Sequence, residues 1–281
     1  MTNKIKIVTD SSVQLTEAEI AKYQITIIPL TIVIDSEVYT DGVNLSRTEF
    51  MTQMAQAKNL PQTSQPSIGT ILDQFDQLTA DGSQVISIHM TETISGTVNA
   101  ARQAAQISKG SITVIDSEFT DRAMAFQVIT AAEMAAAGAS REEIVTAVQS
   151  VRERTQLYMS VTNLTNLVKG GRLSRVSGML SSLLNIKLIL QLHDSQLEAI
   201  HKGRGMKTIN NFYRELIEKM KQAAPIKMIG ISQADDADFA EKLKNQLQAV
   251  LPDVPVLVAP TSPVIATHTG PGAIAVMFYT A

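Results

Sequence analysis

The sequence has 281 residues, a length that corresponds to roughly two domains. Its 44% hydrophobic content, 18% charged content and mean hydropathy of +0.07 exclude a mainly disordered chain. Its 24 basic and 27 acidic residues give a net charge of −3, which disfavours nucleic-acid binding because no basic field exists to hold polyphosphate. The absence of cysteine excludes disulfides, thiolate catalysis and cysteine-ligated metal sites.

The first half of the sequence predicts alternating strands and helices. Capping boxes, which pair a Ser or Thr with a Glu three residues later, predict helices that begin at Thr16, Ser46 and Ser140. A loop is expected over residues 60–66. From residue 84 onward the order βαβα predicts a parallel sheet with helices on its faces. The predicted strands are 4–9, one or two within 25–34, 84–89 and 112–116, and the predicted helices are 16–23, 46–58, 67–78, 95–108, 121–137 and 140–154.

The second half predicts a mixed sheet. An apolar stretch, 178–192, and a strand, 196–200, flank the polar turn His193-Asp194-Ser195, which favours a β-hairpin. The other predicted strands are 156–162, 227–231, 256–258 and 273–279, and the predicted helices are 207–221 and 235–251. We therefore predict an α/β protein with an N-terminal parallel-sheet domain, residues 1–155, and a C-terminal mixed-sheet domain, residues 156–281.

Several common functional motifs are missing from the sequence. It has no phosphate-binding loop, dinucleotide fingerprint, nucleophile elbow or zinc-protease motif, and its four histidines lack metal-ligand spacing. We predict neither a metal nor a cofactor. No apolar run approaches the roughly 18 residues of a membrane span, and the N-terminus lacks a secretion signal. These patterns predict a cytoplasmic protein without an integral membrane segment.

Two polar segments precede predicted helices. The segment 63–67, TSQPS, places three hydroxyls and an amide before a helix, although Ser67 as an N-cap would alone explain it. Ser95 and Gly96 follow the predicted strand 84–89, at the edge of a parallel sheet where ligands bind. A serine at a helix N-terminus suits an anion, and Gly96 has no side chain to block its approach.

Two further segments carry a cation or a titratable group. The glycines Gly170 and Gly171 precede Arg172, an arrangement that presents a guanidinium to a carboxylate or phosphate, or that simply ends a helix beside a surface arginine. Near the C-terminus, the segment His268-Thr269-Gly270-Pro271-Gly272 predicts a histidine held on a rigid Gly-Pro-Gly turn. The turn requires its glycines but not the histidine, which makes His268 a candidate functional residue.

Taken together, these motifs resemble the DegV family, the bacterial fatty-acid-binding proteins that include the FakB subunits of fatty acid kinase. The resemblance covers almost the whole chain. The motifs that carry it are Asp10-Ser11-Ser12, TSQPS at 63–67, SGT at 95–97, Ile115-Asp116-Ser117, GGRLS at 170–174, LNIK at 184–187, Lys202 with Arg204-Gly205, and His268 with GPG.

The resemblance implies a carrier, not an enzyme, that encloses one long-chain fatty acid between its two domains. An ATP-binding fatty acid kinase subunit would then convert the bound fatty acid to an acyl phosphate, and the resemblance associates the protein with phospholipid synthesis. The implied carboxylate-binding residues are Thr63, Ser95 and His268, the supporting pocket residues are Ser64, Gly96, Thr97 and Gly270, and the implied kinase-docking residues are Arg172, Lys202 and Arg204.

Two alternatives to the carrier stay open at this point. The first is a phosphotransferase or hydrolase that uses His268 as nucleophile or base with Ser95 nearby; ATP hydrolysis by the protein alone would distinguish it. The second is a regulatory or structural protein with an empty pocket, which would leave the TSQPS and SGT motifs without a polar ligand.

Overall fold

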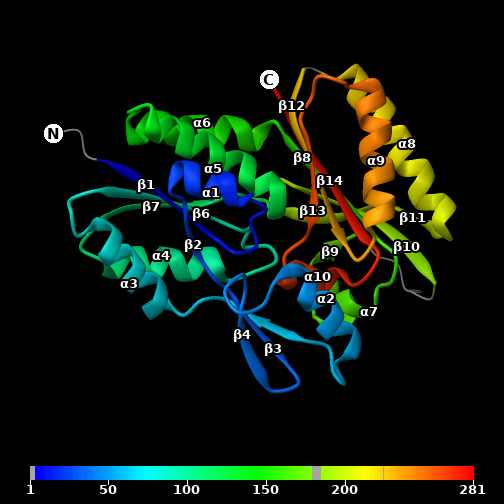
Figure 1. Cartoon of the computed structure of the whole chain (residues 1–281), viewed down its shortest axis with the longest axis horizontal. Helices are drawn as coiled ribbons and strands as arrows, with labels where there is room; N and C mark the ends of the chain where they lie inside the picture. The colour runs from blue at the N-terminus through cyan, green and yellow to red at the C-terminus, as the bar shows by residue number, and fades with distance from the viewer. Residues whose placement is uncertain (1–3, 179–184, 224) are drawn as a thin grey trace.

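Three β-sheets organise the computed structural model, which describes residues 4–178, 185–223 and 225–281 (Figure 1). The first sheet is entirely parallel and has the order β2-β1-β6-β7. Its strands are β1 (Ile5–Asp10), β2 (Thr26–Ile28), β6 (Gln84–His89) and β7 (Ser111–Asp116). The carboxyl ends of these strands point toward the centre of the molecule, as expected for the edge at which a parallel sheet binds ligands.

Helices cover both faces of the parallel sheet. Side chains alternate along the strands, so that Val8 and Val85 pack under α3 (Ile68–Thr79) and α4 (Thr97–Ile107). Ile7 and Ile86 point to the opposite face, which carries α1 (Glu17–Tyr23), α5 (Asp121–Ala136) and α6 (Arg141–Glu153) (Figure 1). Apolar side chains of the parallel strands are therefore buried on both faces of the sheet.

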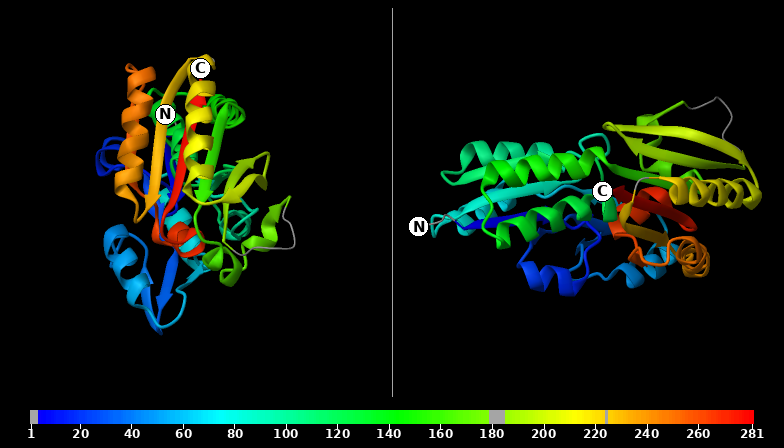
Figure 2. Two further views of the ribbon diagram at one scale, coloured as in Figure 1. Left: turned by 90° about the vertical axis from the view of Figure 1, so that its right-hand side faces the viewer. Right: turned by 90° about the horizontal axis from the view of Figure 1, so that it is seen from above.

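The second sheet is mixed and contains seven strands in the order β13-β12-β14-β8-β10-β11-β9. Helices α8 (Met206–Gln222) and α9 (Ala237–Val250) cover one face, and α5 packs on the other, between the two sheets (Figure 2). The strands are β8 (Thr155–Val161), β9 (Val176–Ser177), β10 (Ile186–His193), β11 (Gln196–Arg204), β12 (Ile226–Ala234), β13 (Val256–Pro260) and β14 (Ala273–Thr280).

A small antiparallel sheet lies beside the ends of the two large ones. It has the order β4-β3-β5 and contains β3 (Thr31–Ile34), β4 (Glu37–Thr40) and β5 (Gln62–Ser64). Short helices surround it: α2 (Arg47–Gln56), α7 (Thr165–Lys169) and α10 (Pro263–Thr269), with the 3₁₀ turn Leu173–Arg175 near α7. This small sheet and α10 bring segments from both halves of the chain together.

The predicted α/β class, the parallel sheet, the mixed sheet and the β10–β11 hairpin are confirmed. The three capping boxes form as predicted. Residues 179–184 of the apolar stretch lie outside the described residues. The elements β4, β5, β9, α7, α10 and the 3₁₀ turn were not predicted, and β11 extends four residues beyond the expected end.

Two local predictions were wrong at positions that matter for the site. The segment predicted as a loop contains β5, because residues 62–64 pair with β3, a contact that local sequence does not encode. Helix α4 begins at Thr97 instead of Ser95: the backbone N–H groups of Ile94 and Ser95 both donate to Thr91 O, which forms a separate turn before the helix.

Candidate functional site

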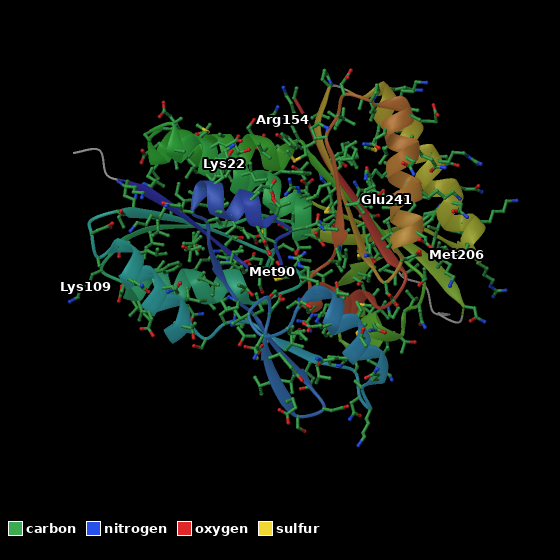
Figure 3. All side chains as sticks on the ribbon, in the orientation of Figure 1. Lys22, Met90, Lys109, Arg154, Met206 and Glu241 are labelled. Atoms are coloured by element: carbon green, nitrogen blue, oxygen red, sulfur yellow. The ribbon has the colours of Figure 1, made fainter. Side chains whose placement is uncertain are left out.

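A cavity of about 320 Å³ lies between the two large sheets. This volume is at the lower end of the range typical of small-molecule sites. Met90, which follows β6, lies on its wall near the centre of the molecule (Figure 3). Most of the wall is apolar and comes from both halves of the chain: Leu30, Met90, Ile94, Leu157, Met159, Leu167, Leu192, Leu197, Val264, Ile265 and Ala275.

Thr63 and His268 meet at the polar part of the cavity wall. Thr63 is held on β5 by the pairing of that strand with β3, and His268 lies in the last turn of α10. The Thr63 Oγ1 and His268 Nε2 atoms are 3.0 Å apart. The expectation that His268 sits on the Gly-Pro-Gly turn was therefore wrong. The missed helix has a clear local signal, since Ser262 caps it and Pro263 occupies its first position.

His268 is neutral at physiological pH. Burial, with a further contribution from the positive charge of Arg172, lowers the pKa of His268 from 6.5 to about 4. Its Nδ1 atom has no hydrogen-bond partner among the described residues and faces the backbone of Gly170, where a Cβ atom would clash with the ring. An unpaired buried N–H is less favourable than an unpaired acceptor, so the proton is assigned to Nε2, which donates to Thr63 Oγ1. The Thr63 hydroxyl is then free to donate into the cavity.

Ser95 lies across the polar rim from α10, in the turn before α4. Its Oγ atom is 2.9 Å from Thr97 Oγ1 and accepts from the Thr97 backbone N–H at 3.3 Å. The adjacent Gly96 packs against the Gln65 side chain, which a Cβ atom at Gly96 would displace. Gly96 is the N-cap of α4 without a side-chain cap, so the first turn of the helix keeps free N–H donors beside the cavity.

Arg172 connects the cavity to an outer hollow of about 500 Å³. It lines both spaces, as do Ile94, Ser95 and Gly96. Its guanidinium donates to Ile94 O at 3.2 Å and to Gly170 O at 2.9 Å, and its remaining donors have no partner among the described contacts. Burial and the nearby Arg175 lower the pKa of Arg172 below its ordinary value. The hollow thus has a cationic wall next to the polar rim.

The structure brings most of the predicted site residues together. Thr63, Ser64, Ser95, Gly96, Arg172 and His268 all line the main cavity. Thr97 is fully buried behind Ser95, and Gly270 ends α10 at a φ of 74°, packed against Asn166.

Two other predicted residues lie elsewhere. Lys202 and Arg204 are exposed on the far part of β11 and line neither space. Gln65 and Gly170 belong to the site but were not predicted, although both fall within motifs that the sequence analysis identified.

Two further features concern metals and membranes. Within residues 4–178, 185–223 and 225–281, no group of three or more His, Asp or Glu side chains could hold a metal ion. No helix of that described part is long and apolar enough to cross a membrane.

The fold and the cavity define the class of the protein: two α/β layers that enclose an apolar space with a polar, cationic rim. The family model described as "Uncharacterised protein, DegV family" matches residues 4–281, and the chain belongs to this family. A DegV domain-containing protein of Streptococcus pneumoniae is 45% identical over 98% of each chain.

Solved structures support the same assignment. The crystal structure of DegV, a fatty acid binding protein from Bacillus subtilis, is 30% identical, covers 99% of this chain and 100% of that chain, and has a TM-score of 0.91. A fatty-acid-binding DegV family protein from Thermus thermophilus is 26% identical over 99% of this chain and 100% of that chain, with a TM-score of 0.88.

Proposed function

We propose that this protein binds one long-chain fatty acid in the cavity and presents its carboxylate to a separate ATP-dependent kinase subunit, which forms the acyl phosphate. The observation that carries the proposal is an apolar cavity whose polar rim adjoins an outer hollow. The names of the B. subtilis and T. thermophilus structures, which describe fatty acid binding, give it independent support. In this proposal residues 1–155 and 156–281 act as two domains with the ligand between them.

Burial of the acyl chain would supply most of the affinity. At about 0.8 kcal/mol per buried CH₂, a chain of about fifteen methylenes contributes roughly 12 kcal/mol before the costs of ordering and association. The polar rim then needs only to orient the head group. The Thr63 and Ser95 hydroxyls can each donate to the carboxylate, while His268 acts behind Thr63 by fixing the direction in which that hydroxyl donates.

The contacts of His268 favour this carrier over the alternative phosphotransferase or hydrolase. A nucleophile and its base need to lie within hydrogen-bond reach, with a third group to orient the base. His268 Nε2 contacts Thr63, whereas Ser95 Oγ is engaged with Thr97. No described carboxylate bonds to His268 Nδ1. ATP hydrolysis by the purified protein alone would reverse this preference.

The direct test is the composition of the bound lipid. Purified protein is denatured, and its organic extract is quantified by mass spectrometry against protein concentration. We expect close to one fatty acid per chain. An extract without fatty acid, or with a different small molecule in that amount, would contradict the proposal.

Removal of one rim hydroxyl should weaken carboxylate binding without affecting the acyl chain. We expect Ser95→Ala and Thr63→Val each to lower fatty acid affinity by about 1 kcal/mol, roughly five-fold, since each loses one hydrogen bond. Displacement of a fluorescent fatty acid measures the change. The fatty alcohol of the same chain length is the control ligand, because it keeps the apolar chain but lacks the carboxylate and its charge. An equal loss for acid and alcohol would remove these residues from the head group.

We further propose that the kinase subunit docks at the outer hollow, with Arg172 facing the transferred phosphoryl group. Arg172→Ala should leave the lipid content unchanged but lower acyl-phosphate formation with the kinase by at least about ten-fold, because a cation at the reaction centre is removed. Lys169→Ala, an exposed cation outside both spaces, is the matched control. Loss of lipid from Arg172→Ala would instead place Arg172 on the ground-state carboxylate.

A further inference from the structure

The tripeptide Asp10-Ser11-Ser12 at the end of β1 is buried and lines no part of the cavity. β1 is an inner strand of the parallel sheet, so this segment lies beneath the site at the ligand-binding edge. Each of its three side chains bonds to a different segment of the cavity wall. The proposed function assigns no role to these residues.

Asp10 holds the segment that leads to Ser95. Its Oδ2 atom accepts from the Met90 backbone N–H at 2.9 Å and is 3.1 Å from His89 Nδ1. Met90 lines the cavity and immediately precedes the turn from Thr91 to Ser95. Asp10 therefore fixes the point at which this turn leaves the sheet.

Ser11 holds the segment that leads to Thr63. Its Oγ atom accepts from the Leu30 backbone N–H at 3.0 Å and donates to Asp41 Oδ2 at 2.7 Å. Leu30 lines the cavity and precedes β3, whose Ile32 pairs with Thr63. The Ser11 hydroxyl thus adds a direct bond between β1 and the start of the small sheet that carries Thr63, beyond the backbone pairing of β1 with β2.

Ser12 bonds to the third segment, at the start of α5, and also to Asp10. Its Oγ atom donates to Asp10 Oδ1 at 2.6 Å and accepts from Thr120 Oγ1 at 3.1 Å, and its carbonyl accepts from the Asp121 N–H. Thr120 and Asp121 both line the cavity. The Asp10–Ser12 bond therefore links the Ser95 side of the wall to the start of α5.

We propose that Asp10, Ser11 and Ser12 are positioning residues that set the spacing of the Thr63 and Ser95 hydroxyls for one carboxylate, without touching the ligand. The proposal rests on the proposed function. Two hydroxyls that share one carboxylate must each be held within about 0.5 Å of the position that suits binding, which requires support from the residues behind them. This tripeptide bonds to the segments of both hydroxyls.

The test compares the affinity for a long-chain fatty acid with that for the alcohol of the same chain length, at one alkaline pH. In Ser11→Ala we expect the ratio of acid to alcohol affinity to fall about five-fold, since the Leu30 N–H loses its side-chain partner on β1. Ser12→Ala, a second variant, should lower the same ratio in case Ser11→Ala does not fold. A ratio unchanged in the folded variants would overturn the proposal.

Ser117→Ala is the matched control. Ser117 is equally buried at the same edge of the sheet, but its hydroxyl bonds only to the backbone of Phe119. Ser117→Ala should lower the stability of the protein and leave the ratio of acid to alcohol affinity unchanged. If the ratio fell as far as in Ser11→Ala, a general loosening of the structure would explain the fall in both variants. If the wild-type protein does not prefer the acid, the proposed function fails, whereas a wild-type preference that survives in Ser11→Ala and Ser12→Ala removes only the positioning role.

Discussion

Replacing Gly230 by alanine is expected to destabilise the protein by about 3 kcal/mol, because the added methyl group overpacks a buried contact between the two halves of the chain. Gly230 lies on β12 against α5, and a Cβ atom there would come within 2.6 Å of Arg122 Cβ. Arg122 has no room to withdraw. Its guanidinium is held by Glu19 at 2.7 and 2.8 Å and by Gln14 O at 3.0 Å. Denaturant unfolding monitored by circular dichroism measures the loss.

A double-mutant cycle shows whether this clash is the cause. Arg122→Gly is itself destabilising, because it leaves the Glu19 carboxylate without its cation and places a glycine inside α5. In that background, however, Gly230→Ala should cost almost nothing, since the Arg122 Cβ and Cγ atoms that it overlaps are gone. Gly69→Ala is the control. A Cβ atom at Gly69, in α3, meets only Ser67 Oγ at 3.8 Å, and the change should stabilise the helix slightly. Additive losses in the cycle would argue against the clash.

Acidification is expected to destabilise the protein through His268. The folded state holds the pKa of His268 at about 4, against 6.5 for a free imidazole. Above pH 6.5 the ring is neutral in both states, and its contribution to stability is fully present. As the pH falls from 6.5 to 4, only the unfolded chain takes up the proton, so stability falls by up to about 3 kcal/mol and then levels off.

The difference in the free energy of unfolding between the wild-type protein and His268→Gln, measured as a function of pH, isolates this effect. Glutamine keeps a donor for Thr63 but does not titrate in this range. The difference is needed because burial raises the pKa of Asp41 to about 6, and this carboxyl shifts stability in the opposite direction over an overlapping range. His201→Gln, at an exposed position on β11, is the control and should follow the wild-type protein. Parallel curves for wild type and His268→Gln would show that His268 is not held neutral.

The local parts of the fold could be predicted because their causes lie within a few residues. The capping boxes at Thr16, Ser46 and Ser140 each join positions three residues apart, and all three form. Helix α10 has an equally local signal in Ser262 and Pro263, but it was not predicted, because the glycines that follow this short helix are typical of a turn. Strand β5 has no such signal, since three residues between prolines become a strand only when β3 lies beside them.

The candidate site also has a part that local sequence predicts and a part that depends on the fold. Sequence motifs were enough to select candidate residues: Thr63, Ser95, Arg172 and His268 stand in motifs that combine hydroxyls, a guanidinium and an imidazole with glycines. How these residues are arranged depends on the tertiary fold. Thr63 meets His268 across 205 positions of sequence, and Ser95 bonds to Thr97 instead of His268. The physical reason is range, because capping and alternation act over a few residues, whereas sheet pairing and burial bring together side chains that no local pattern connects.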